Sequence, residues 1–213
     1  VEVLDSPPGC PDAVFPNNWF STHEDGRMVV YPMMLEARRS ERSLLTAEVF
    51  ADYDDVWDLT GYEAQGQYLE GTGSLVLDRD ARVAFACLSP RTDRELAERW
   101  ADRMGYRLVI FEAFDAGGVP VYHTNVVMAV GSTWAVICDE ACADAALVIR
   151  ELRDLGKSVV TITLPQMSAF CGNILELDSG VAMSRTAYDA LRADQLEVIL
   201  ADRPAIVADI PTI

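Results

Sequence analysis

Basic residues are scarce in this chain. Its 213 residues include 17 lysines and arginines against 34 aspartates and glutamates, which gives a net charge of −17 at pH 7. Binding to nucleic acid or to an anionic membrane surface needs clustered Lys and Arg side chains, so the charge balance argues against both as partners. The surplus of acid suits a cationic small molecule, although an ordinary solvated acidic surface is the commoner source of such a surplus.

Long apolar runs, paired cysteines and histidine clusters are also missing. No stretch approaches the ~20 apolar residues of a membrane-spanning helix, and no signal-peptide pattern opens the chain. The cysteines are odd in number and contain no CxxC pair: Cys10, Cys87, Cys138, Cys142 and Cys171. This usage predicts a protein of the reducing cytoplasm rather than a disulfide scaffold. The two histidines stand far apart and match no zinc motif, so no metal site is predicted.

Half of the residues are apolar, and a repeated pattern organises them. Four polar clusters rich in Gly, Asn and Thr each lead into an apolar stretch, and Asn18, Gly73, Asn125 and Asn173 mark equivalent positions about 50 residues apart. Each repeat continues through a turn, a second strand, usually a capped helix and a third strand. Such a unit cannot bury its own apolar face alone, so the period predicts an α/β propeller or array spanning residues 1–213 as one domain.

Local signals place the elements of each repeat. Helices are expected over 40–52, from a Thr92/Glu95 capping box to Gly105, from Asp144 to Gly156, and after Ser184 and Asp194. Strands are expected over 1–4, 28–31, 75–77, 83–88, 108–111, 126–130, 133–138, 159–164, 181–183 and 206–210.

Three polar side chains at the entrances of the repeats are candidates for chemistry. In a radial array the equivalent strand ends meet near the axis, so Asp12, Glu70 and His123 are expected to converge on one cleft. A carboxylate beside a histidine is a general acid/base arrangement, and a second carboxylate can hold a cation. The plainer alternatives are a structural histidine at a strand entrance and, for Asp12, a turn former in a proline-rich loop.

Four motifs carry a resemblance that spans essentially the whole chain: DAVFPNNWFS at 12–21, LEGTGS at 69–74, YHTNV at 122–126 and FCGNILE at 170–176. Together they resemble the amidinotransferase, or pentein, superfamily, and within it the citrulline-utilisation hydrolase branch, related to arginine deiminase and dimethylarginine dimethylaminohydrolase. The resemblance implies a five-bladed α/β propeller with the active site on its axis. About four of the five ββαβ-type units are visible, so we expect the chain to be a segment of a longer protein, truncated at both ends.

The resemblance also implies roles for individual residues. Glu70 matches the catalytic carboxylate, His123 the catalytic histidine, and Asp12 the carboxylate that binds the guanidinium or ureido group. Asn18 and Asn125, at the repeat entrances, are further candidate substrate-binding residues. The nucleophilic cysteine of the family lies in a glycine-rich segment that this chain does not contain, and Cys171, which has no nearby Lys or Arg to lower its pKa, is not expected to replace it.

The function that these features favour is hydrolysis of a guanidino or ureido C–N bond in a citrulline- or arginine-like amino acid, without cofactor or metal. On that hypothesis residues 1–213 alone are inactive, because the nucleophile lies after residue 213. The alternatives are a non-catalytic propeller that binds a small cation, and an amidinotransferase in which an amine replaces water. The sequence leaves the identity of the substrate and the oligomeric state open.

Overall fold

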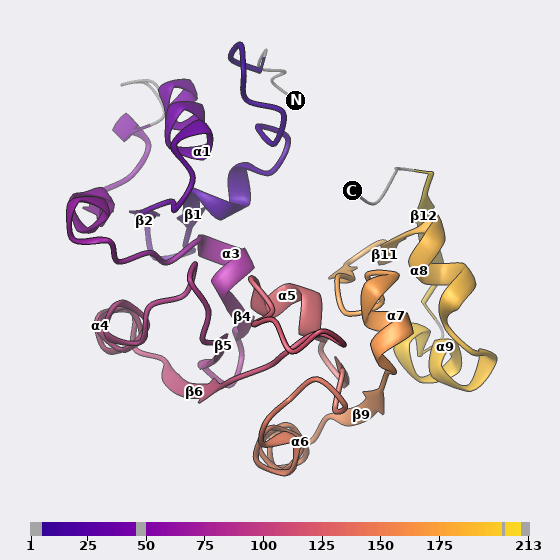
Figure 1. Ribbon diagram of the computed structural model, residues 1–213. Coiled ribbons are helices and arrows are strands. Elements are labelled where there is room, and N and C mark those ends of the chain that lie inside the picture. The colour runs from indigo at the N-terminus through magenta and orange to yellow at the C-terminus, as the bar shows by residue number, and fades with distance from the viewer. Residues whose placement is uncertain (1–5, 46–49, 202, 210–213) are drawn as a thin grey trace.

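The computed structural model describes residues 6–45, 50–201 and 203–209. These residues form four three-stranded sheets, in each of which the first strand is antiparallel to the second and the second is parallel to the third. Figure 1 shows the four units following one another in an arc around a common centre, with the first and fourth units at its two ends. This arrangement confirms the α/β propeller expected from the repeat.

In each unit two strands are followed by helical segments and then by a third strand. The bounds of the elements are as follows. Unit 1 contains η1 (Pro16–Asn18), β1 (Phe20–Thr22), β2 (Arg27–Val30), α1 (Glu36–Ser40), η2 (Glu41–Leu44), β3 (Asp55–Asp58) and η3 (Thr60–Gln65). Unit 2 contains α3 (Gly71–Ser74), β4 (Leu75–Asp78), β5 (Val83–Cys87), α4 (Arg94–Met104) and β6 (Arg107–Phe111). Unit 3 contains α5 (Thr124–Val127), β7 (Met128–Val130), β8 (Trp134–Ile137), α6 (Ala145–Asp154) and β9 (Ser158–Thr161). Unit 4 contains α7 (Leu164–Ser168), β10 (Leu175–Leu177), β11 (Gly180–Ser184), α8 (Arg185–Ala190), α9 (Ala193–Leu200) and β12 (Ala205–Ala208).

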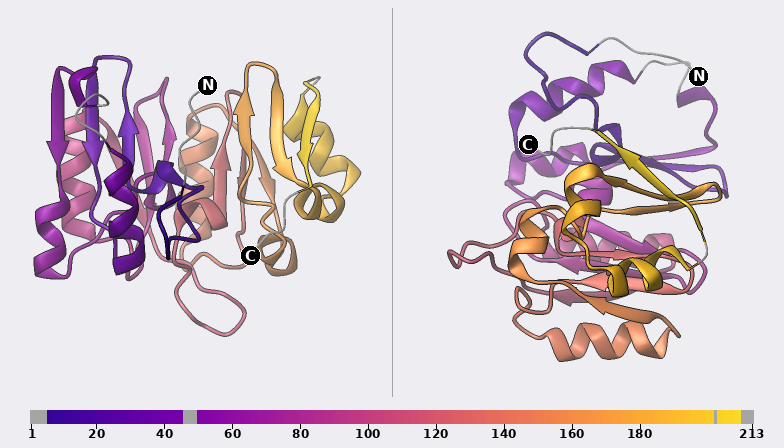
Figure 2. Two further views of the ribbon diagram at one scale, coloured as in Figure 1. Left: turned by 90° about the horizontal axis from the view of Figure 1, so that it is seen from above. Right: turned by 90° about the vertical axis from the view of Figure 1, so that its right-hand side faces the viewer.

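The core lies between the sheets and the helices that cover them. Every residue of the central strands β5 and β8 is buried, as expected for strands covered on both faces. Helix α4 buries Leu96, Trp100 and Met104 on one face, and the Trp100 Nε1–H donates to the Tyr31 hydroxyl at 2.9 Å, which ties unit 2 to unit 1. In Figure 2, strands and helices of the units run side by side, so the strand ends of different units reach common faces of the molecule.

The helix predicted over 40–52 is wrong at its start, where the α-helix α1 runs over Glu36–Ser40 and a 3-10 turn, η2, follows at Glu41–Leu44. Near its predicted end, residues 50 and 51 are helical. A buried ion pair between Arg38 Nε and Glu41 Oε2 at 2.8 Å joins α1 to η2. Val49 itself lies outside the described residues, as do residues 1–4 and the end of the strand predicted over 206–210.

One predicted N-cap and the end of one predicted strand also differ from the structure. Asp93, not Thr92, is the N-cap of α4: its carboxylate accepts the Leu96 N–H at 3.0 Å, while the Thr92 hydroxyl is used elsewhere. The strand predicted over 159–164 ends at Thr161, because Thr163 caps the unpredicted helix α7 with a capping box. None of the helices in the described part of the chain combines the length and apolarity needed to cross a bilayer.

The strand predicted over 126–130 begins two residues later than expected. Residues 124–127 form the one-turn helix α5, and residues 71–74 form the equivalent helix α3. Figure 1 shows α3 and α5 toward the centre of the arc, and Glu70 and His123 are the residues that directly precede these two helices.

Candidate active site

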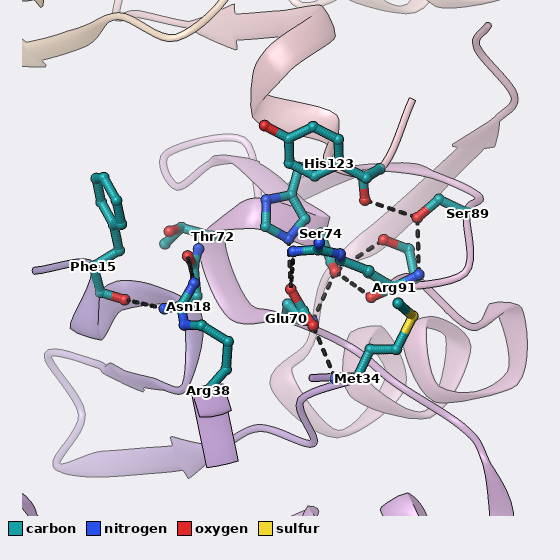
Figure 3. Close-up of polar contacts among 12 residues, drawn as sticks. Phe15, Asn18, Met34, Arg38, Glu70, Thr72, Ser74, Ser89, Arg91 and His123 are labelled. Carbon is teal, nitrogen blue, oxygen red and sulfur yellow. Dashed lines mark hydrogen bonds and ion pairs between the residues drawn. The ribbon is translucent and has the colours of Figure 1, made fainter. Parts of the chain in front are cut away.

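Glu70 and His123 meet between units 2 and 3. His123 Nε2 lies 2.7 Å from Glu70 Oε2, and Figure 3 shows the ring directed at the carboxylate. Glu70 is fully buried and His123 is 6% exposed. The structure therefore brings together two of the three side chains that were expected to converge, although 53 residues separate them in sequence.

The Glu70 carboxylate has further partners on both oxygens. The Met34 N–H donates to Oε1 at 2.9 Å, and Arg91 Nη1 lies 3.5 Å from Oε2. Burial by itself would raise the pKa of Glu70, but the His123 hydrogen bond, the Met34 amide and the Arg91 charge outweigh it and hold this pKa below its usual value. Glu70 is therefore ionised at neutral pH.

The imidazole of His123 is neutral under the same conditions. Burial lowers the pKa of His123 below its usual 6.5; Glu70 opposes this shift, and the positive charges of Arg91 and Arg38 add to it. Because the ionised carboxylate accepts, Nε2 carries the proton of the neutral ring and Nδ1 is left as an acceptor. Among the described residues Nδ1 makes no hydrogen bond, so it is available to take a proton.

The ring of His123 lies against a glycine. A Cβ added at Gly73 would stand 2.7 Å from Cε1, Nδ1 and Nε2 of the ring, closer than such atoms pack. Gly73 therefore leaves the space that the imidazole occupies. The Tyr122 ring lies at a centroid distance of 4.8 Å from the imidazole.

Arg91 is a component of the site that sequence reasoning missed. Its guanidinium lies over the Tyr122 ring at 5.0 Å and beside Glu70, and its side chain is 22% exposed. The arginine stands in the loop between β5 and α4, where its sequence context carries no signal beyond its charge. Its partial exposure leaves a positive group at the edge of the buried pair.

The other predicted site residues differ in their surroundings. Asp12 is half-buried in the 11–14 turn and makes no side-chain hydrogen bond or ion pair to Glu70 or His123 among the described residues. Burial raises the pKa of Tyr122; the Arg91 charge opposes this rise and the Asp12 charge adds to it. Asn18 is buried, with Oδ1 accepting from Arg38 Nη1 at 3.3 Å.

Asn125 has a buried oxygen without a partner. Its Oδ1 makes no hydrogen bond within the part of the chain that the structure describes. A buried acceptor left in this way is costly unless something donates to it. The role of Asn125 in substrate binding stays a prediction.

Four of the five cysteines, Cys87, Cys138, Cys142 and Cys171, are poor nucleophiles. All five are free, and four are buried. Burial raises the pKa of Cys87 to about 12, of Cys138 to about 11, of Cys142 to about 12 and of Cys171 to about 11. A reactive cysteine needs the opposite shift, because the thiolate is the attacking species. Across the described ranges, no group of three or more His, Cys, Asp and Glu side chains is arranged to hold a metal ion.

A hollow of ≈560 Å³ lies at the other end of the first strands, lined by the turns that follow β4, β7 and β10. Its main charges are already paired: Lys157 with Asp78 at 2.8 Å, and Arg203 with Glu176 at 3.0 Å. None of the predicted site residues lines it. We therefore place the candidate site at Glu70 and His123, where the pKa values of both side chains are shifted and Nδ1 of His123 is free to accept a proton.

The second histidine, His23, provides a test of acid sensitivity outside the site. Burial, with a smaller contribution from Arg79, lowers the pKa of His23 from 6.5 to about 4. A lowered pKa means that the unfolded chain binds the proton more tightly, so this contribution to stability is complete above pH 6.5 and is lost as the pH falls toward 4. His23→Gln should therefore reduce the fall in Tm between pH 7.5 and pH 5.

Because the His23 ring is only half-buried, solvent screening limits this effect to about 1 kcal/mol, or roughly 2–4 °C in a protein of this size. Thermal melts of the two proteins at both pH values measure it. An equal fall in Tm in both would show that His23 does not carry the acid sensitivity.

The whole chain, residues 1–213, matches the family described as N,N dimethylarginine dimethylhydrolase, eukaryotic. No curated protein matches it. Among solved structures, the substrate-bound N-terminal domain of ArgZ, an arginine dihydrolase from the ornithine-ammonia cycle in cyanobacteria, superposes with a TM-score of 0.72 at 19% identity, over 95% of this chain and 70% of that one.

Two further structures show the same fold. AgrE in complex with L-arginine gives a TM-score of 0.74 at 17% identity, over 93% of this chain and 28% of that one. The C249S mutant of DDAH from Pseudomonas aeruginosa, complexed with citrulline, gives a TM-score of 0.68 at 17% identity, over 94% of this chain and 70% of that one. At these identities the likeness concerns the fold alone, whereas the family match covers every residue. The chain thus belongs to the N,N dimethylarginine dimethylhydrolase family of the pentein, or amidinotransferase, superfamily.

Proposed function

We propose that the protein hydrolyses a C–N bond of a guanidino or ureido amino acid. The observation that carries this proposal is the buried pair of Glu70 and His123, 2.7 Å apart, in which the carboxylate is charged and the imidazole is neutral with Nδ1 free. A histidine poised in this way can take a proton in one step and return it in the next.

In the proposed reaction His123 acts in two successive steps at the same carbon, and Glu70 acts through His123. Neutral His123 takes the proton of a cysteine thiol, the resulting thiolate attacks the central carbon of the substrate, and His123 gives that proton to the departing amine as the C–N bond breaks. Neutral His123 then takes a proton from water, whose oxygen attacks the same carbon. The C–S bond breaks, and the released thiolate recovers a proton from His123. Glu70 orients the ring and stabilises the imidazolium that forms between the steps.

The nucleophile in this proposal is a cysteine outside residues 1–213. The support comes from the cysteines within the chain, since none of the five contacts Glu70 or His123 in a recorded hydrogen bond and four have a raised pKa. Residues 1–213 would then supply the acid/base pair and part of the substrate site. The cytoplasmic location stays part of the proposal and rests on the odd number and scattered positions of the cysteines in the sequence.

Substrate recognition in the proposal divides between two partly exposed charges, Asp12 and Arg91. Glu70 is fully buried and already holds three partners, so its part is to fix His123 rather than to receive the substrate directly. Asp12, which is partly exposed, is the carboxylate left to meet a guanidinium. Arg91 is a cation suited to the carboxylate of an amino-acid substrate.

The test is incubation of the intact protein with arginine, citrulline and N,N-dimethylarginine, with ammonia, dimethylamine, ornithine and citrulline measured as products. Release of an amine or ammonia in water alone supports the hydrolase. Product formation only when a second amine is added supports amidine transfer. Binding by calorimetry without any turnover would instead favour the non-catalytic cation-binding propeller.

Cys171 provides a control for the position of the nucleophile. Its side chain is fully buried and its thiol lies 3.4 Å from the Ala187 carbonyl oxygen, so we expect Cys171→Ala to keep most of the activity of the intact protein. The measurement is kcat on the best substrate found above. A loss of about 10³-fold or more, the scale of removing a nucleophile, would make Cys171 the attacking residue.

A further inference from the structure

Thr124 directly follows His123 and is fully buried. Its hydroxyl makes two short hydrogen bonds: it donates to the Ser74 carbonyl oxygen at 2.6 Å and accepts the Cys87 N–H at 2.8 Å. Both partners belong to unit 2, one at the end of α3 and the other at the end of β5. One side chain of unit 3 is therefore bound to two separate elements of the neighbouring unit.

Ser74, the partner of Thr124, also holds the backbone of Glu70. The Ser74 hydroxyl accepts the Glu70 N–H at 2.7 Å and donates to the Arg91 carbonyl oxygen at 2.9 Å. It also accepts from the Thr92 hydroxyl at 2.9 Å. Figure 3 shows Ser74 beside Glu70, with Arg91 next to both. Ser74, which is hydrogen-bonded to the backbone of both Glu70 and Arg91, is thus also hydrogen-bonded to Thr124, the residue after His123.

A second bond supports the other side of His123. The Ser89 hydroxyl donates to the Tyr122 carbonyl oxygen at 2.8 Å, but this contact is partly exposed. The Thr124 contacts are buried, where an unmade hydrogen bond is more costly than at the surface. Thr124 is therefore the stronger of the two links.

We propose that Thr124 is a positioning residue, which holds the His123 ring in contact with Glu70 by binding its own one-turn helix to Ser74 and Cys87. This inference rests on the proposed role of His123 as the acid and base. Thr124 contacts none of the reacting groups; it fixes the spacing of units 2 and 3 at the place where their two side chains meet. Without the hydroxyl, the Ser74 carbonyl and the Cys87 N–H are left unpaired, and α5 is free to move with His123.

The experiment compares Thr124→Val, which keeps the shape and removes the hydroxyl, with Thr124→Ser, which keeps the hydroxyl. The readout is the rate at which the Nε2 proton of His123 exchanges with water, measured by NMR. The signal is readily assigned because the chain has only two histidines. We expect Thr124→Val to speed exchange by at least about tenfold, the scale of one buried hydrogen bond, and Thr124→Ser to stay within about twofold of the wild type.

The matched control is Thr163→Val. Thr163 loses a hydroxyl that accepts the Gln166 N–H at 3.3 Å at the cap of α7, so it tests a general loss of stability without contact to His123. It should lower Tm and leave the exchange rate of the His123 proton unchanged. If Thr124→Val does not fold, Thr124→Ala removes the same hydroxyl without a branched side chain and is measured in its place.

The outcomes distinguish the positioning role of Thr124 from the proposed acid/base role of His123. A protected proton in the wild type that exchanges equally slowly in Thr124→Val overturns the positioning role and leaves the proposed function standing. Fast exchange in Thr124→Ser also overturns it, because packing of the methyl group and not the hydroxyl would then hold the ring. Absence of any protected Nε2 proton in the wild type removes the Glu70–His123 hydrogen bond, and with it both proposals.

Discussion

Replacement of His123 by alanine is expected to lower kcat/KM of the intact protein by about 10²–10⁴-fold, because it removes the group that carries the proton in both steps of the proposed reaction. Glu70→Gln keeps the size and hydrogen bonding of the side chain and removes the charge that stabilises the imidazolium. Since the two side chains act as one unit at 2.7 Å, the double variant should be little worse than His123→Ala alone.

Thermal melts accompany these rates as the control for folding. His123→Ala leaves the Glu70 carboxylate its contacts with Met34 and Arg91, so the expected loss of stability is about 1–3 kcal/mol and not collapse. Losses of activity that simply add in the double variant would show that Glu70 and His123 act separately. Unfolding of either single variant would show that the pair is mainly structural.

Gly73→Ala is expected to lower kcat/KM by about 10²-fold with little effect on folding. The added methyl group would stand 2.7 Å from three atoms of the His123 ring, so the ring must move away from Glu70. A misplacement of about 1 Å in a catalytic group has an effect of this size. The φ angle of Gly73 is one that alanine adopts, so the contact with the ring is the source of the effect.

Gly61→Ala is the matched control, because a Cβ at Gly61 meets nothing within 4 Å and its φ is also ordinary. It should keep wild-type activity. The combination of Gly73→Ala with His123→Ala should be no slower than His123→Ala, since both act through the same ring. A Gly73→Ala protein with full activity would show that the ring has room to shift and that its contact with Glu70 is not required.

Much of the repeat was predictable because its signals are local. Helices α4 and α6 have apolar residues on one face and a glycine after the end, and these signals are read within some 12 residues. The N-cap of α6, Asp144, was also predicted, whereas that of α4 is Asp93 and not the predicted Thr92. The buried strands β5 and β8 are short apolar runs between turns. The short helices α3 and α5 were missed, because their Gly, Thr and Asn residues have no helical periodicity and their conformation is set by packing between units.

The sequence by itself determined the four-unit plan, the superfamily resemblance and the choice of Glu70 and His123 as candidates, because each of these is carried by motifs within single segments. Only the tertiary structure decided that the two side chains lie 2.7 Å apart, that Arg91 joins them, that Glu70 is too buried to meet substrate directly, and that Thr124 and Ser74 connect the two units. The physical reason is that these properties depend on how one sheet packs against the next. Burial, pKa and hydrogen-bond distance at the centre of the arc are set by residues about 50 positions apart, and no local pattern in the chain records that packing.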